Sequence, residues 1–302
     1  MSKLMFSTIA YKPLMDSMIT KGHFEAGLLT RKDFPDGEHY TRFLTPIDGR
    51  DVILIGGTIN DRDTLEIYDL ACGIVAAGAH KLWIVIPFFG YATMERAVNE
   101  GEIIMAKTRA RLLSSIPQPG SGIQFILLDL HVDSIACYFE GPARTVHLHG
   151  TELLLTMIKS VAESNDFILA STDAGRAKQV QALANHLGVF PAFVFKRRLD
   201  SGATEVSAVS AQVQGKQVII YDDMIRTGGS LINAVKAYKD AGASKISVVT
   251  THGVFAGDAI KKLQECGLIN KIVVTDSHPN ATLYKSEFVS VFSVDTILTL
   301  FF

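Results

Sequence analysis

The stretch Val218-Ile219-Ile220-Tyr221-Asp222-Asp223-Met224-Ile225-Arg226-Thr227-Gly228, followed by Gly229 and Ser230, carries the clearest structural pattern in this chain. Its apolar run predicts a buried strand that ends at two acids, and residues 230–241 have the periodicity of a helix. A strand, a glycine-containing loop and a helix N-terminus therefore follow one another. Such a junction presents backbone N–H groups and the positive end of a helix dipole, which together bind a phosphate.

The paired acids indicate that the phosphate belongs to a sugar. Carboxylates at the end of a strand accept hydrogen bonds from vicinal hydroxyls or help to hold a hydrated divalent cation. A single acid at this place is as well explained as a cap of the next helix, but a cap needs only one oxygen and this chain offers two carboxylates. The predicted pentose phosphate site comprises Asp222, Asp223, Arg226, Thr227, Gly228, Gly229 and Ser230.

Composition limits the classes of protein that this chain can belong to. Its 302 residues suggest two domains of about 150 residues each. With 20% charged and 48% hydrophobic residues it is expected to be globular. The formal charge of -2 gives no general attraction to nucleic acid or to a membrane surface. Three cysteines without C-x-x-C spacing, and no signal peptide or membrane span, predict a cytoplasmic protein with reduced thiols.

Apolar runs alternate with helical patterns along the whole chain, which predicts an α/β fold with mainly parallel sheets flanked by helices. Strands are expected at 51–56, 81–87, 124–130, 166–171, 192–195, 217–221 and 245–251. Helices are expected at 64–77, 106–115, 152–162, 177–187 and 230–241. A polar junction at 147–151 divides the chain into domains 1–149 and 150–302.

The stretch from Val218 to Ser230 resembles the phosphoribosyl-binding loop of the type I phosphoribosyltransferase fold. It is most similar to that of the ribose-phosphate diphosphokinases, also called phosphoribosyl pyrophosphate synthetases, and the likeness extends over residues 34–276. The resemblance implies two type I phosphoribosyltransferase-like domains, the first on the nucleotide side and the second carrying the ribose 5-phosphate loop. Family members have an acid where this chain has Arg226, so this arginine either contacts the sugar phosphate or marks an altered activity.

Two further segments end strands in residues that suit a metal–nucleotide complex. His131 follows a strand in Asp129-Leu130-His131; a lone histidine is more often structural, but the resemblance assigns this one to the metal and ATP. Asp173 either coordinates magnesium or caps the helix at 177–187, and the resemblance places the matching aspartate at the cation and ribose site. His131 and Asp173 are therefore the expected metal ligands, with Mg²⁺ as the cofactor.

Lys196-Arg197-Arg198 follows the strand expected at 192–195. Three cations in a row are either a solvated loop or a clamp for a diphosphate. The resemblance implies that Lys196 and Arg198 serve catalysis. Residues 199–204 are either a mobile lid or a plain hairpin connection.

Phe34, Asp36 and Glu38 read by themselves as part of a turn. The resemblance implies an adenine-binding loop that in many members reaches into the neighbouring subunit, and hence a homo-oligomer. Thr93-Met94 stands where common members have an Arg-Gln pair that contacts ATP, while Arg96 remains to reach the phosphates. This form is more like the class II synthetases of plants, which accept several nucleoside triphosphates.

The resemblance implies transfer of diphosphate from MgATP to ribose 5-phosphate, which forms phosphoribosyl pyrophosphate and AMP for nucleotide biosynthesis. A phosphoribosyltransferase would share the loop but would need only one α/β unit and a base-binding hood. A non-catalytic regulatory homologue is the other alternative. The changes at Thr93-Met94 and Arg226 favour it, whereas Lys196, Arg198 and the paired acids oppose it.

Overall fold

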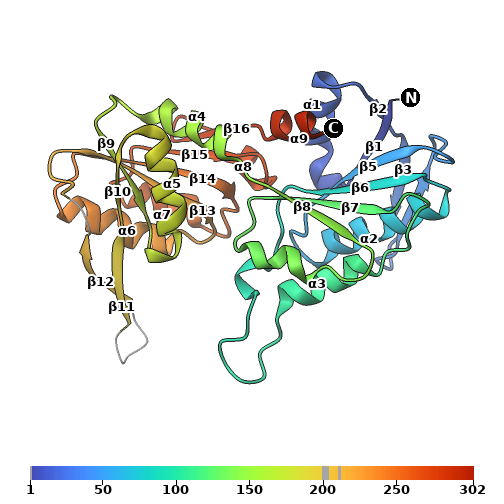
Figure 1. Cartoon of the computed structure of the whole chain (residues 1–302), viewed down its shortest axis with the longest axis horizontal. Helices are drawn as coiled ribbons and strands as arrows, with labels where there is room; N and C mark the ends of the chain where they lie inside the picture. The colour runs from blue at the N-terminus through green and yellow to red at the C-terminus, as the bar shows by residue number, and fades with distance from the viewer. Residues whose placement is uncertain (1, 199–203, 210–211) are drawn as a thin grey trace. The chain divides into compact units, whose positions relative to one another are not determined.

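The computed structural model describes residues 2–198, 204–209 and 212–302, with the backbone alone for 195–198 and 204–208. The chain forms two compact units, Met1–His149 with Asp295–Phe302, and Gly150–Val294 (Figure 1). The predicted division after residue 149 differs from these units at the C-terminal end, where residues 295–302 belong to the first unit. Asp295 explains this placement, because its buried carboxylate accepts hydrogen bonds from Lys21 Nζ at 2.7 Å and from the Ser17 hydroxyl.

The first unit is built on a parallel sheet with the strand order β2-β1-β5-β6-β7-β8. Its central strands are buried along almost their whole length, as expected where helices cover both faces. The strands are β1 (Lys3–Ser7), β2 (Phe24–Ala26), β5 (Asp51–Ile55), β6 (Lys81–Ile86), β7 (Ile123–Leu128) and β8 (Arg144–Leu148). The helices are α1 (Lys12–Lys21), α2 (Asp61–Ala76), α3 (Met105–Ser114) and α9 (Asp295–Phe301). An antiparallel hairpin of β3 (Leu29–Asp33) and β4 (His39–Phe43) stands apart from the sheet.

The second unit has a parallel sheet with the order β10-β9-β13-β14-β15-β16. Two apolar clusters cover its faces, one contributed by α4 (Thr151–Val161) and α5 (Ala177–Leu187), the other by α6 (Gly229–Asp240) and α7 (Ala259–Glu265). The strands are β9 (Phe167–Ser171), β10 (Phe190–Ala192), β13 (Gln217–Ile225), β14 (Lys245–Gly253), β15 (Lys271–Thr275) and β16 (Val289–Phe292). A short helix, α8 (Asn280–Leu283), precedes β16, and β11 (Val194–Arg198) pairs with β12 (Thr204–Val209) in a separate antiparallel ribbon.

The two units share one topology. Each strand of the first sheet has a counterpart eight strands later in the second, and the β3–β4 hairpin corresponds in the same way to the β11–β12 ribbon. The loop after β5, which leads into α2, is thus the counterpart of the loop after β13, which leads into α6. The chain therefore contains two versions of one α/β unit, as the repeated rhythm of its sequence predicted.

The predicted α/β class with two parallel sheets is confirmed, and among the strand ends that differ from the prediction two bear on the predicted sites. β13 continues to Ile225, so the paired acids lie within the strand instead of after it. The reason is that β9 stops at Ser171, opposite Tyr221, whereas β14 continues to pair with β13 as far as Gly253. Likewise β11 runs to Arg198 in the two-stranded ribbon, so the predicted cations lie on a strand and not in a loop.

Candidate sugar phosphate and nucleotide sites

Asp222 and Asp223 lie on β13, just beyond the end of β9. The Thr172 hydroxyl donates to Asp222 Oδ2 at 2.7 Å, and the backbone N–H of Asp223 donates to Asp222 Oδ1 at 2.9 Å. Arg176 forms an ion pair with Asp223 Oδ1 at 2.7 Å, and its Nε lies 3.8 Å from Asp222 Oδ1. The loop after β9 thus holds both carboxylates in place. Such ionised acceptors are suited to vicinal sugar hydroxyls.

Burial and the neighbouring Asp223 carboxylate raise the pKa of Asp222 to about 7. The hydrogen bond from Thr172 and the charge of Arg176 act in the opposite direction and do not cancel these effects. Two carboxylates this close resist being ionised together, so the pair takes up a proton as the pH falls through about 7. A strongly shifted acid near the carboxyl end of a strand in a parallel sheet is typical of a functional site.

The start of α6 is open to an anion. Gly228 precedes the helix with a left-handed backbone at φ 81°, where a glycine is favoured, and none of the described side chains caps the helix. The first turn of α6 contains no acid, and Thr227, Gly229 and Ser230 are exposed. By contrast, Asn60 caps α2 by accepting a hydrogen bond from Asp63 N. Of the two matching helix starts, that of α6 is therefore the one with the character of a phosphate site.

The other predicted site residues of the second unit are Asp173, Lys196 and Arg198. Asp173 Oδ1 accepts from Gly175 N at 2.9 Å and so caps the short 3-10 helix Ala174–Arg176, not α5 itself. Its role as a metal ligand stays a prediction. The side chains of Lys196 and Arg198 lie outside what the structure describes, as do residues 199–203 of the predicted lid.

Phe34, Asp36 and Glu38 lie in the turn between β3 and β4. Phe34 N donates to Glu38 O at 2.9 Å, and Glu38 N donates to Asp36 Oδ1 at 3.1 Å. The Lys32 ammonium lies 4.8 Å from the centre of the Phe34 ring, and Phe34 is partly exposed. The three residues predicted to bind adenine are thus brought together on one hairpin.

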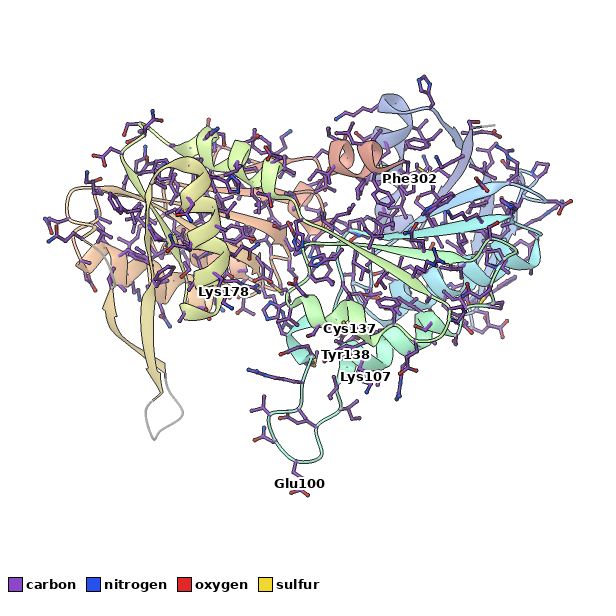
Figure 2. All side chains as sticks on the ribbon, in the orientation of Figure 1. Glu100, Lys107, Cys137, Tyr138, Lys178 and Phe302 are labelled. Carbon is purple, nitrogen blue, oxygen red and sulfur yellow. The ribbon has the colours of Figure 1, made fainter. Side chains whose placement is uncertain are left out.

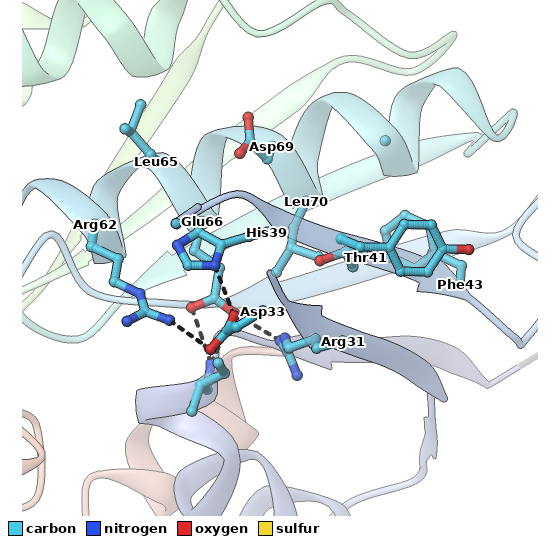
Figure 3. Close-up of a pocket in the computed structure, with 14 residues that line it drawn as sticks. Arg31, Asp33, His39, Thr41, Phe43, Arg62, Leu65, Glu66, Asp69 and Leu70 are labelled. Atoms are coloured by element: carbon cyan, nitrogen blue, oxygen red, sulfur yellow. Dashed lines mark hydrogen bonds and ion pairs between the residues drawn. The ribbon is translucent and has the colours of Figure 1, made fainter. Parts of the chain in front are cut away.

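A cavity of about 730 Å³ lies between this hairpin and α2 (Figure 3). Its walls carry paired charges: Asp33 binds His39 Nδ1 at 2.7 Å and approaches Arg62 at 3.5 Å, while Arg31 binds Glu66 at 2.9 Å. The sequence did not reveal this cavity, because it exists only where the hairpin lies against a helix that is distant along the chain.

Arg96 and His131 belong to two loops at the carboxyl edge of the first sheet. Arg96 is exposed and lies 3.4 Å from Glu95. Beyond it the chain forms a projecting loop with Glu100 at its tip (Figure 2). Tyr138 holds the base of this loop by donating to Glu95 O at 2.6 Å. Both residues predicted to contact ATP therefore lie in loops that follow the carboxyl ends of strands, where open α/β sheets bind ligands.

Asp129, His147 and His149 form a cluster that the sequence analysis missed. One ligand atom from each lies within 4.8 Å of the others. His147 lies on β8 and His149 directly after its end, and Asp129 follows the adjacent β7 with φ 40°. Burial and the nearby His149 lower the pKa of His147. His147 Nε2 accepts from Leu130 N at 2.8 Å, so the ring already supports the loop that leads to His131.

The chain has two parallel sheets flanked by helices, and the loop before α6 is open to a phosphate. These features define a pair of type I phosphoribosyltransferase-like domains. Residues 3–116 match the model of the N-terminal domain of ribose phosphate pyrophosphokinase, and residues 168–299 match the phosphoribosyl synthetase-associated domain. The chain belongs to the ribose-phosphate pyrophosphokinase family, as its sequence motifs predicted.

Relatives and a solved structure support this membership over most of the chain. The ribose-phosphate pyrophosphokinase of Corynebacterium efficiens is 32% identical over 92% of this chain and 85% of its own length. The Gloeobacter violaceus protein of the same name is 34% identical over 84% of this chain and 75% of its own. The crystal structure of phosphoribosylpyrophosphate synthetase from Mycobacterium smegmatis matches with a TM-score of 0.88 and 26% identity, covering 100% of this chain and 97% of that one.

Proposed function

We propose that this protein transfers the β,γ-diphosphoryl group of MgATP to the anomeric hydroxyl of ribose 5-phosphate. The O1 oxygen of the sugar forms a bond to Pβ, and the bond between Pβ and the α,β-bridging oxygen breaks. AMP leaves with that oxygen, and the hydroxyl proton is released. The products are phosphoribosyl pyrophosphate and AMP.

The observation that carries the proposal is the uncapped start of α6 beside a buried carboxylate pair. The segment would present N–H groups and two hydroxyls to the 5-phosphate, with Arg226 as a nearby cation, and comprises Thr227, Gly228, Gly229 and Ser230. Asp222 and Asp223 accept the sugar hydroxyls. A sugar ester held at both ends presents its O1 in one direction, which is the positioning that phosphoryl transfer requires.

Lys196 and Arg198 are proposed to stabilise the charge of the transferring diphosphate. Both residues belong to β11 (Val194–Arg198), the strand that follows β10. Cations are the main catalytic groups that a protein can offer to a loose phosphoryl transition state. The adenine of ATP would be bound by Phe34, Asp36 and Glu38. Its triphosphate would be bound by Arg96 and His131.

We propose Mg²⁺ as the cofactor, held with the nucleotide by Asp173 and His131. The Asp173 carboxylate suits this cation, because magnesium prefers oxygen ligands and this side chain lies at the carboxyl end of β9. Bound magnesium would neutralise charge on the triphosphate. No helix among the described residues is long and apolar enough to span a bilayer. A cytoplasmic homo-oligomer that shares its nucleotide site and accepts several nucleoside triphosphates remains our proposal, with no nucleic acid or membrane as partner.

Incubation with ribose 5-phosphate and MgATP, without any base, tests the reaction. AMP and phosphoribosyl pyrophosphate should form in equal amounts. AMP should be absent when ribose 5-phosphate is omitted. Release of pyrophosphate only from a mixture of phosphoribosyl pyrophosphate and a purine or pyrimidine would instead identify a phosphoribosyltransferase. Binding of both substrates without turnover would identify a regulatory homologue.

A further inference from the structure

Arg176 connects the loop after β9 to both acids of the sugar phosphate site. It is the last residue of the 3-10 helix Ala174–Arg176, and only 15% of its side chain is exposed. Its guanidinium lies 2.7 Å from Asp223 Oδ1 and 3.8 Å from Asp222 Oδ1. Asp223 is 4% exposed and Asp222 19% exposed, so the three charges lie together where water is largely excluded.

The positive charge of Arg176 reduces the repulsion between the two carboxylates. Two ionised carboxylates in a buried site repel each other, which raises the pKa at which one of them takes up a proton, and a nearby cation lowers that pKa again. A divalent metal ion is one way to supply that cation. Arg176 supplies it from the protein, and a guanidinium does not lose its charge at any pH in the physiological range.

We propose that Arg176 is the built-in counter-cation of Asp222 and Asp223, so that ribose 5-phosphate binds to this site without a metal ion. The inference rests on the proposed function and deepens it, because it concerns how the same sugar site keeps its charge. Magnesium would then be required by the nucleotide and not by the sugar. Arg176 acts as a positioning residue, through the carboxylates that contact the hydroxyls.

A metal ion at the carboxylates would be in competition with the arginine. The guanidinium already occupies one oxygen of Asp223 at hydrogen-bonding distance, and a second cation beside it would be repelled. Among the described residues, the groups next to Asp222 are Asp223 on the same strand and, from the loop after β9, Arg176 and the neutral hydroxyl of Thr172. Removal of the arginine charge should therefore both open a place for a metal ion and favour the protonated pair.

Calorimetric titration of ribose 5-phosphate into the full-length protein tests the inference, in EDTA and again in millimolar MgCl₂. The wild-type Kd should differ less than about twofold between the two buffers. Arg176→Gln should raise the Kd in EDTA by about tenfold or more, as expected when a buried ion pair loses one partner. Magnesium should restore part of that loss, and the affinity of the variant should fall more steeply as the pH is lowered from 8 to 6.

Lys178→Gln is the matched control, since Lys178 is an exposed cation two residues further along the chain. It should bind like the wild type in both buffers. A wild-type Kd that weakens tenfold in EDTA overturns the inference alone and needs no folded variant. Arg176→Gln with unchanged affinity and no response to magnesium also overturns it. Absence of wild-type binding in both buffers would overturn the proposed function, and the inference with it.

Discussion

Asp222→Asn should stabilise the second unit by an amount that grows as the pH rises from about 4 to about 7 and is constant above that range. Burial and the Asp223 carboxylate raise the pKa of Asp222 from an ordinary 3.8 to about 7 in the folded protein. Between these pH values the folded protein keeps a proton that the unfolded chain has released. The free energy of unfolding therefore falls as the pH rises from about 4 to about 7, and the effect is constant above that range.

The gap between the two pKa values sets the size of the effect. At about 1.4 kcal/mol for each pH unit, it corresponds to a ceiling of about 4 kcal/mol. Asparagine keeps the oxygen that accepts from Asp223 N–H and removes the charge. The variant should therefore match the wild type near pH 4 and exceed its unfolding free energy by about 2 to 4 kcal/mol at pH 8.

Hydrogen exchange followed by mass spectrometry provides the assay. Peptides covering β14 (Lys245–Gly253) report opening of the sheet beside β13, and comparing the two proteins at one pH cancels the intrinsic exchange rate. Asp240→Asn, which removes an exposed acid at the end of α6, should leave protection unchanged at every pH. Equal protection of Asp222→Asn and wild type at pH 8, or a difference that does not vary with pH, would refute the reasoning.

Three further substitutions test the phosphate loop and the proposed clamp. Ser230→Asp should weaken ribose 5-phosphate binding at least about tenfold in calorimetry by repelling the 5-phosphate, whereas Asn233→Asp, one turn along α6, should change it little. Gly228→Ala should destabilise the second unit by about 1–2 kcal/mol in hydrogen exchange, because φ is 81° and the added methyl would lie 3.2 Å from Leu263. Lys196→Ala should lower kcat for AMP formation at least about 100-fold while the Kd for ribose 5-phosphate stays within about twofold, and an unchanged kcat would exclude the clamp.

The sequence predicted what depends on local pattern. Buried strands and amphipathic helices follow from the period of the apolar residues. A glycine at position 228 likewise indicates a turn, and its backbone is left-handed in the structure. The end of β13 could not be predicted this way, since polar residues continue a strand wherever a neighbour such as β14 supplies hydrogen bonds. Asp222 and Asp223 therefore lie within a strand because β14 is long and β9 is short, and not because aspartate has a high propensity for strands.

Contacts between segments that are distant along the chain could not be predicted from the sequence for a related reason. Arg176 reads as an ordinary cation near a helix start, and only the fold brings it to carboxylates about 50 residues away. The alternation of His147 and His149 was a visible signal, because alternate residues of a strand share a face. Its partner Asp129 became recognisable only once β7 and β8 were seen to be neighbours.

The matching topology of the two units explains why one loop and not its counterpart has the character of a phosphate site. α2 and α6 follow corresponding strands, but Asn60 caps α2, and Asp61 and Asp63 place negative charge in its first turn. Those features stabilise a helix and repel an anion. α6 begins at Gly229 with neither feature, although a cap would add about 1 kcal/mol. The buried carboxylate pair beside this helix start lowers the free energy of unfolding by more than the missing cap does. A ligand that binds at both places would supply the missing interactions, which explains why neither place is optimised for stability.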